Sequence, residues 1–228
     1  MKEQALICVS NDEGGRVRVR VQRAAKRNAI TRGMWRSLLA ALETAASDDG
    51  VRALTIEGSD GVFSAGADLQ SVKTQDGTVR DEYRDLALTT LSVLEGFPRP
   101  TLALVDGPCI GAGCSLALAC DVRFATTRST FAIPALRHGI MYERQSIERL
   151  VSLVGPSQTE RLLLAGIGID GHEAERIGLV DSCTDRLEGT SREWLDEVMR
   201  VEPIAIQTMR ALIKRASREH QFGKRSKR

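Results

Sequence analysis

Two short glycine-containing segments have the composition needed to present backbone N–H groups to a ligand. They are residues 64–68 (Ser-Ala-Gly-Ala-Asp) and residues 111–114 (Gly-Ala-Gly-Cys), and each lies between an expected strand and an expected helix. Small residues let a ligand approach the main chain, and the first N–H groups of a helix point outward with the positive end of the helix dipole behind them. Such a pair of loops suits an oxyanion. Short glycine-rich turns also serve merely as tight connections, and a GxG pattern alone decides little.

The cysteine and charge content narrows the possible chemistry. The five cysteines include neither a CxxC pair nor histidines at zinc spacing, so we expect reduced, mostly buried thiols and no metal site. They are Cys8, Cys109, Cys114, Cys120 and Cys183. With 32 basic and 30 acidic residues the formal net charge is +2, which gives no electrostatic case for nucleic acid or an anionic membrane as a partner. No run of about 18 apolar residues and no signal-peptide profile occur, so the sequence predicts a cytoplasmic protein.

The elements that must position the two loops alternate between strand and helix. Residues 4–9 and 16–21 bracket a glycine-containing turn and predict a hairpin, and a helix with Thr31 as its N-cap follows. The further expected elements are strands at 51–57, 101–105 and 121–125, a helix opening at 111, two or three helices within 146–177 and a last helix at 203–217. Strands that alternate with helices imply a twisted sheet covered by helices.

The length favours one domain. An α/β chain of 228 residues with 42% hydrophobic content is long enough for one well-buried core. We expect this domain to span 1–228, with a core at about 4–180, a C-terminal helical part at about 181–217 and a basic tail at 218–228. The tail lacks a cluster of apolar residues that could anchor it, so we expect it to be disordered. The alternative is an arm that contacts phosphate groups.

The order and surroundings of the two loops resemble the crotonase (enoyl-CoA hydratase/isomerase) superfamily over residues 5–215. The resemblance is carried by Lys-Arg-Asn-Ala-Ile at 26–30, Phe-Ser-Ala-Gly-Ala-Asp-Leu at 63–69, Val-Asp-Gly-Pro-Cys-Ile-Gly-Ala-Gly-Cys-Ser-Leu-Ala-Leu-Ala-Cys-Asp at 105–121, Gly155-Pro156, and Ala-Glu-Arg-Ile-Gly-Leu-Val at 174–180. It implies an α/β fold of the ClpP/crotonase type, built from repeated ββα units with C-terminal helices. It also implies assembly into homotrimers or hexamers, and a hydrophobic acyl tunnel beside a CoA site.

The same resemblance assigns roles to the loops. It implies that the N–H groups of Ala67 and Ala112 form an oxyanion hole for a thioester carbonyl, with Gly111 and Gly113 shaping the second turn. An enolate carries charge on that oxygen, where two preorganised amides stabilise it. The other residues that the resemblance places at the acyl-CoA are Lys26, Arg27, Ala29, Ala65, Gly66, Asp68 and Leu69. Lys26 and Arg27 lie where the family often contacts CoA phosphates, the alternative being that they are only solvated. CoA is part of the substrate, and no separate cofactor is expected.

The sequence departs from the hydratase pattern at both catalytic glutamates. Ser115 and Ala135 occupy those positions, and neither side chain performs general acid–base catalysis at neutral pH. Glu143, eight positions after Ala135, matches a catalytic aspartate of dienoyl-CoA isomerases and chlorobenzoyl-CoA dehalogenases. It is the main catalytic candidate, and the alternative is a solvent-facing residue paired with Arg144. His138 is a weaker acid–base candidate, the alternative being a structural or exposed residue. Ser115 remains able to bond a substrate or water.

These observations predict an isomerase-like enzyme of the enoyl-CoA hydratase/isomerase family that binds an acyl-CoA thioester and stabilises its enolate. The alternative is a non-catalytic fatty acyl-CoA-binding protein, which the loss of both glutamates favours. A scaffold without a ligand would require the glycine loops to be collapsed. By the resemblance the chain is also shortened at its C-terminus, which implies a more open acyl pocket or altered assembly.

Overall fold

The protein is described by a computed structural model that covers residues 6–12, 14–72 and 76–223, with side chains up to Ser217. The strands are β1 (Leu6–Asn11), β2 (Arg16–Gln22), β3 (Ala53–Gly58), β4 (Thr101–Val105), β5 (Pro108–Ile110), β6 (Val122–Ala125), β7 (Thr130–Ala132), β8 (Ile169–Asp170) and β9 (Ser182–Cys183). The helices are α1 (Arg32–Ser47), α2 (Leu69–Val72), α3 (Gly77–Gly96), α4 (Ala112–Ala119), α5 (Arg144–Leu164), α6 (Gly171–Arg176), α7 (Leu187–Met199) and α8 (Pro203–Gly223), with short 3₁₀ turns η1 (Ala24–Lys26) and η2 (Leu136–His138). The side chains of the basic tail at 218–228 lie outside the described residues.

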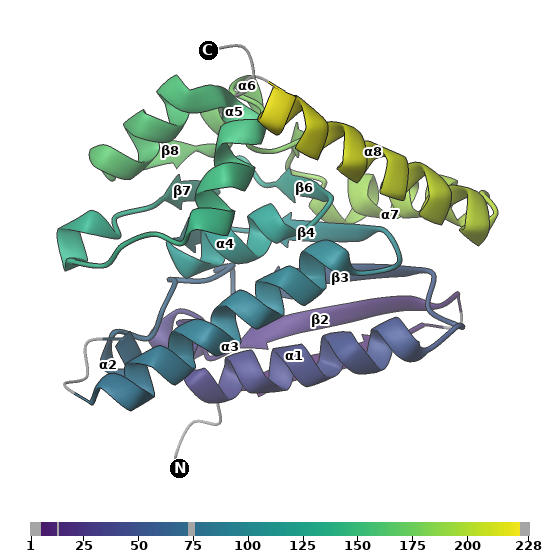
Figure 1. The fold of residues 1–228 in the computed structure, drawn as a ribbon. Helices are drawn as coiled ribbons and strands as arrows, with labels where there is room; N and C mark the ends of the chain where they lie inside the picture. Colours follow the sequence, from purple (N-terminus) through teal and green to yellow (C-terminus); the bar gives the residue numbers. More distant parts are fainter. Residues whose placement is uncertain (1–5, 13, 73–75, 224–228) are drawn as a thin grey trace.

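A six-stranded sheet forms the centre of the molecule, in the order β1-β2-β3-β4-β6-β9 (Figure 1). The pair β1–β2 is antiparallel, whereas every other pair in this sheet is parallel. A second sheet of three short strands, in the order β5-β7-β8, stands beside it. The predicted α/β class and the N-terminal hairpin are therefore confirmed.

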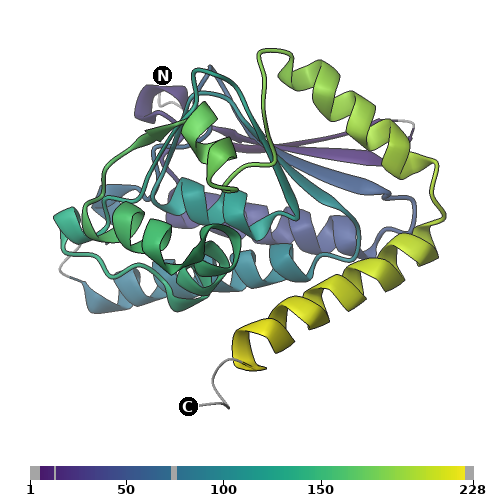
Figure 2. The same ribbon diagram turned by 90° about the horizontal axis from the view of Figure 1, so that it is seen from above.

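The two faces of the main sheet are covered unequally. Helices α1 and α3 lie on one face and α7 lies on the other (Figures 1 and 2). Successive side chains of β4 point to opposite faces of the sheet. Ala103 and Val105 belong to the larger apolar cluster, while Leu102 and Leu104 belong to a smaller one with Leu195 of α7. A parallel strand buried on both faces is expected to be apolar throughout, as the sequence of β4 is.

Local signals in the sequence account for several element boundaries. The hydroxyl of Thr31 accepts a hydrogen bond from the N–H of Met34 at 3.2 Å, which confirms the predicted cap of α1. Helix α5 changes direction at Gly155, whose φ of 76° lies in the left-handed region, and Pro156 follows it. The expected helices within 146–177 are α5 and α6. Helix α3 was not predicted.

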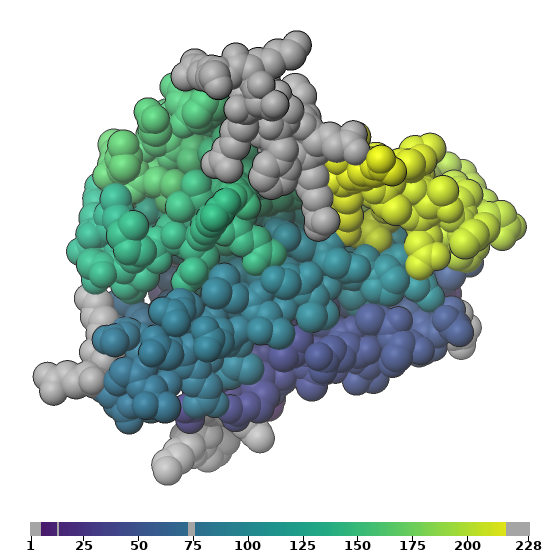
Figure 3. Space-filling view, viewed as in Figure 1, coloured from purple at the N-terminus to yellow at the C-terminus, as the bar shows by residue number. Residues whose placement is uncertain are grey.

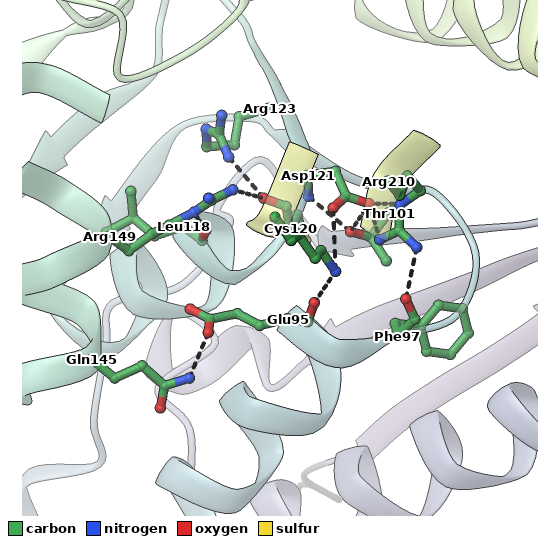
Figure 4. Close-up of polar contacts among 11 residues, drawn as sticks. Glu95, Phe97, Thr101, Leu118, Cys120, Asp121, Arg123, Gln145, Arg149 and Arg210 are labelled. Carbon is green, nitrogen blue, oxygen red and sulfur yellow. Dashed lines mark hydrogen bonds and ion pairs between the residues drawn. The ribbon is translucent and has the colours of Figure 1, made fainter. Parts of the chain in front are cut away.

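Helix α4 is buried along seven of its eight residues, and its C-terminal end is held by arginines. Arg149 of α5 donates to the carbonyl oxygens of Leu118 and Cys120 at 3.1 and 3.3 Å, and Arg123 donates to Cys120 at 2.8 Å (Figure 4). Cations at this end satisfy carbonyls that a helix leaves unpaired and complement its dipole. The helix is thus fixed at one end while its N-terminal end faces the glycine loops.

The outermost element is α8, which is held largely by polar contacts. Arg210 donates to the carbonyl of Phe97 at 2.7 Å and pairs with the carboxylate of Asp121 (Figure 4). Lys214 donates to the carbonyl of Glu95. Within the described ranges, none of the helices is long and apolar enough to cross a membrane.

Candidate active site

The first glycine loop is an extended segment that pairs with residues 28–30. The N–H of Ile30 donates to the carbonyl of Gly66 at 2.8 Å, and the N–H of Asp68 donates to the carbonyl of Ile30 at 2.9 Å. Residue 67 sits between these two bonds as the partner of Ile30 in a parallel bridge. Because successive N–H groups of an extended chain point to opposite sides, the N–H of Ala67 faces away from Ile30. As expected, this loop leads into a helix, α2, which has only four residues.

The second glycine loop turns sharply into α4, as the sequence predicted. Gly111 has a φ of 53°, a conformation that glycine adopts without steric cost, and its N–H donates to the carbonyl of Ala132 at 2.8 Å. Its own carbonyl accepts from the N–H of Ser115 at 3.1 Å, which is the first bond of α4. Ala112 therefore occupies the first position of the helix, where the N–H has no partner within the helix.

The fold brings the two loops into direct contact although 45 residues separate Ala67 from Ala112 in the sequence. Ser64 and Cys109 form a parallel bridge, with bonds of 3.0 and 2.9 Å on either side. A Cβ atom placed on Gly66 would lie 2.6 Å from the carbonyl oxygen of Ile110 and 3.4 Å from the nitrogen of Ala112. One placed on Gly113 would lie 2.9 Å from Ser64. Glycine is thus needed at both positions for this approach.

The N–H groups of Ala67 and Ala112 are both available to a ligand. Across the described part of the chain, neither group donates a hydrogen bond to the protein, and both residues are partly exposed. Each is oriented through its own peptide unit, since the carbonyl and N–H of a trans peptide point in opposite directions. The carbonyl of Gly66 is tied to Ile30 and that of Gly111 to α4, so the two N–H groups point away from those anchors.

Glu143 lies at the N-cap of α5, where its side chain makes no capping hydrogen bond. Burial raises the pKa of this carboxyl, Arg84 offsets part of that effect, and Asp85 adds to it. Both neighbours belong to α3, so Glu143 faces that helix, and the surfaces of α3 and of the segment leading into α5 lie side by side in Figure 3. Arg144 pairs with Glu148 at 2.8 Å and not with Glu143.

The two positions matched to the hydratase glutamates both have side chains that contact other parts of the protein. The buried hydroxyl of Ser115 donates to the phenol oxygen of Tyr142 at 2.7 Å, so it is engaged within the protein. The methyl group of Ala135 packs against the main core at the start of η2. His138 ends η2 and is exposed, which agrees with the alternative given for it above.

The residues predicted to line CoA gather around the first loop. The N–H of Ala65 donates to the carbonyl of Arg27 at 2.8 Å, so the exposed Lys26 and Arg27 lie next to that loop. Ala29 is partly buried in the paired segment, and Leu69 is exposed at the start of α2.

Asp68 has a structural partner. Its carboxylate accepts a bond from Arg23 at 2.9 Å and bonds from the N–H and hydroxyl of Ser71 at 3.2 and 3.0 Å. Burial acts to raise the pKa of Asp68, but the bonds from Arg23 and Ser71 outweigh it and leave the pKa lowered. Arg23 also donates to the carbonyl of Ala29 at 3.2 Å.

Two residues at the site were missed by the sequence analysis. Arg23 fixes the first loop, and Tyr142 places its hydroxyl 3.3 Å from the carbonyl of Gly111. Tyr142 directly precedes Glu143, and the chain contains only two tyrosines, which was a usable signal. No signal in the sequence marked Arg23, because its partner Asp68 is 45 residues away.

In the described part of the chain, two large clefts lie away from the glycine loops. One of about 810 Å³ is lined by charged residues that include Arg20, Glu57 and Arg128, and one of about 790 Å³ lies between α5, α7 and α8. The candidate site is therefore defined by its backbone groups and not by the size of a cavity. Among the residues with described side chains, no cluster of three histidine, cysteine, aspartate or glutamate side chains is placed to hold a metal ion.

Comparison with known proteins identifies the family. Residues 12–227 match the family described as enoyl-CoA hydratase/isomerase. The 2,3-dehydroadipyl-CoA hydratase of Escherichia coli (strain K12) is 31% identical over 200 residues, which cover 86% of this chain and 77% of that protein. Among solved structures, DspI of Pseudomonas aeruginosa superposes with a TM-score of 0.88 at 27% identity, covering 95% of this chain and 89% of that chain. AtuE of the same organism has a TM-score of 0.85 at 30% identity, with 91% and 82% covered. The chain therefore belongs to the enoyl-CoA hydratase/isomerase family, whose members act on acyl-CoA thioesters, and it has the predicted crotonase fold.

Proposed function

We propose that the protein binds an acyl-CoA with its thioester oxygen between the N–H groups of Ala67 and Ala112, and that Glu143 moves a proton in an isomerase-like reaction. The carboxylate of Glu143 takes a proton from a carbon next to the thioester system, and the electron pair left behind is delocalised onto the oxygen as an enolate. Where the acyl chain carries a double bond conjugated with this enolate, return of the proton to another carbon of the system shifts that double bond. The two N–H groups stabilise the charge where it develops.

The observation that carries the proposal is the pair of oriented backbone donors. Two peptide N–H groups from loops far apart in sequence lie next to each other with no partner among the described residues, while the carbonyl of each peptide unit is fixed. Unpaired backbone donors are rare in folded proteins unless water or a ligand receives them. A single oxygen that gains negative charge is the group they fit best.

Hydration is not part of this proposal. It needs a water molecule held between an acid and a base. The resemblance places those groups at Ser115 and Ala135, of which one bonds Tyr142 and the other is a methyl group. The relative from Escherichia coli is named a hydratase, so the reaction proposed for this chain differs from the one in that relative's name.

The second candidate function is acyl-CoA binding without catalysis. The presence of Ser115 and Ala135 at the positions matched to the hydratase glutamates favours it, because Glu143 is then the single carboxylate proposed for proton transfer. Backbone donors bind a thioester whether or not a base is present, so both functions share the oxyanion hole.

Exchange of substrate protons separates the two functions. We expect the parent protein to bind butyryl-CoA and to exchange the protons next to its thioester with deuterium oxide, and the Glu143→Gln variant to bind without exchange. Glu148→Gln, which changes an exposed glutamate on the same helix, is the matched control and should exchange normally. Binding without exchange in the parent would establish the second function instead.

The pH dependence supplies a check on the role of Glu143. The carboxyl must be ionised to accept a proton, and its pKa is raised above the ordinary value of 4.5. The exchange rate should therefore rise with pH through that raised pKa and then level off. An acid limb at the ordinary value of a solvated glutamate would contradict the assignment.

The assembly and location of the protein stay as predicted from the resemblance and the composition. A homotrimer or hexamer is expected, with no nucleic acid or membrane as partner and with a cytoplasmic location. Sedimentation of the purified chain gives its assembly directly.

A further inference from the structure

Tyr142 makes a hydrogen-bonded chain that ends on the second glycine loop. The hydroxyl of Ser115 donates to the phenol oxygen at 2.7 Å, and the phenol donates to the carbonyl of Gly111 at 3.3 Å. A phenol carries one proton, so donation to Gly111 leaves its oxygen free to accept from Ser115. The hydrogen bonds therefore all donate in one direction, from Ser115 on α4 to Tyr142 and from Tyr142 to the carbonyl of Gly111, just before α4.

The carbonyl that Tyr142 contacts belongs to the same peptide unit as the N–H of Ala112. A trans peptide is planar, so any group that fixes the carbonyl of Gly111 also fixes the direction of that N–H. The carbonyl already accepts from the N–H of Ser115 at 3.1 Å. Among the residues with described side chains, Tyr142 alone adds a side-chain donor to it.

A second anchor matters here because this peptide follows a glycine. Gly111 has φ 53° and ψ −113°, and glycine reaches conformations with either sign of φ at little cost. Rotation of this unit would turn the N–H of Ala112 away from a ligand. Donation to the carbonyl also polarises the amide, which makes its N–H a stronger donor.

We infer that Tyr142 is a positioning residue, which orients and strengthens the Ala112 N–H donor by holding the carbonyl of the same peptide unit. The inference rests on the proposed oxyanion hole. It assigns no proton transfer to the phenol. Burial raises the pKa of Tyr142 well above its ordinary value, Cys114 raises it further, and the bond from Ser115 offsets part of this shift, so the phenol keeps its proton as a donor.

The carbonyl stretch of a bound thioester reports the strength of the oxyanion hole without turnover. Butyryl-CoA labelled with a heavy isotope at the thioester carbonyl is bound to each variant, and difference infrared spectroscopy measures the frequency. We expect a clear downshift in the parent protein and a smaller downshift in Tyr142→Phe. The rate of proton exchange should fall about fivefold, the factor equivalent to one neutral hydrogen bond, with the dissociation constant for butyryl-CoA unchanged.

The matched control removes a similar bond elsewhere on α5. The buried hydroxyl of Thr159 donates to the carbonyl of Gly155 at 2.8 Å, so Thr159→Val loses one hydroxyl-to-carbonyl bond without touching the loops. Its carbonyl downshift should equal that of the parent. An equal downshift in the parent and Tyr142→Phe overturns the role of Tyr142 while leaving the oxyanion hole intact. Absence of any downshift in the parent overturns the proposed function itself.

A second variant keeps the test decisive if Tyr142→Phe does not fold. The other tyrosine is Tyr83, so Tyr83→Phe protein grown on 3-fluorotyrosine carries the label at position 142 only. Fluorination makes the phenol a stronger donor with little change in size. We expect a larger carbonyl downshift than in unlabelled Tyr83→Phe protein, and an unchanged downshift overturns the inference.

Discussion

At positions 67 and 112 the side chain is only a methyl group, so the chemistry proposed for them resides in the peptide nitrogen. Substitution by another side chain leaves that nitrogen in place, which allows the donors to persist while catalytic side chains change. Ser115 and Ala135 illustrate such change, because they stand where the resemblance expects carboxylates. A test at the scale of one residue must therefore remove the N–H itself.

Proline at position 112 removes this donor selectively. Ala112 is the first residue of α4, a position where proline fits the helix and loses no internal hydrogen bond. We expect Ala112→Pro to lower the rate of proton exchange by about 10²–10³-fold, as loss of one oxyanion-hole donor typically does. Measurement of exchange kinetics together with butyryl-CoA affinity separates loss of catalysis from loss of binding.

The chain offers a matched control at the start of α3. Gly77 is also a first helical residue, and the preceding Asp76 has φ −72° and ψ 106°, a conformation compatible with a following proline. Gly77→Pro should leave exchange unaffected. Equal rate losses in both variants would mean that proline acts through the fold and not through the donor.

At the scale of elements, the first loop is kept in register by an ion pair rather than by a helix. Arg23 bonds both the carboxylate of Asp68 and the carbonyl of Ala29, so it joins the two segments that meet at Ala67. Both side chains of the pair are less than one-fifth exposed, at 17% and 13%. Loss of one member leaves its partner with an unsatisfied charge.

Asp68→Asn should lower the free energy of unfolding by about 2 kcal/mol at neutral pH, the usual contribution of a hydrogen bond to a charged group. The folded-state pKa of Asp68 is lowered below 3.8, so its stabilisation is complete above that value and is lost as the pH falls through the lower one. Urea unfolding should therefore show a difference between parent and variant that shrinks in acid. Glu197→Gln, which breaks an exposed pair with Arg200, should change stability by less than about 1 kcal/mol. A difference for Asp68→Asn that is independent of pH would contradict the role of the ionised carboxylate.

The elements around the site differ in how far the sequence predicted them. The strand at 101–105 and the helix from 111 were confirmed, because a short apolar run and a glycine turn are local signals. Helix α3 was missed, since only four of its 20 residues are buried and its apolar periodicity is weak. The contact between Gly66 and Ala112 has no local signal at all, because a parallel bridge between distant segments creates it. Only the resemblance to a family linked the two loops beforehand.

At the scale of the whole molecule, α8 presents an unusual face to the body. Its inward positions include Arg210 and Lys214, whereas Ile204, Met209 and Leu212 are more than half exposed, at 69%, 58% and 54%. The helix is therefore docked through its own charged side chains, which contact the carboxylate of Asp121 and the backbone carbonyl oxygens of Glu95 and Phe97, and not through an apolar stripe. The packing of the sheet does not depend on it in the way that it depends on α1 and α3.

Neutralising Asp121 should accordingly loosen α8 while leaving the rest of the fold in place. Asp121 accepts bonds from the N–H and hydroxyl of Thr101 at 2.9 and 3.0 Å as well as its contact with Arg210, and an asparagine oxygen can keep only part of this set. We expect Asp121→Asn to speed amide hydrogen exchange throughout α8 and not in α1, because regions with few buried apolar contacts open locally. Asp106→Asn, which breaks a pair with Arg128, serves as the control and should leave α8 unchanged. Unaltered protection of α8 in Asp121→Asn would show that contacts other than those of the Asp121 carboxylate hold this helix in place.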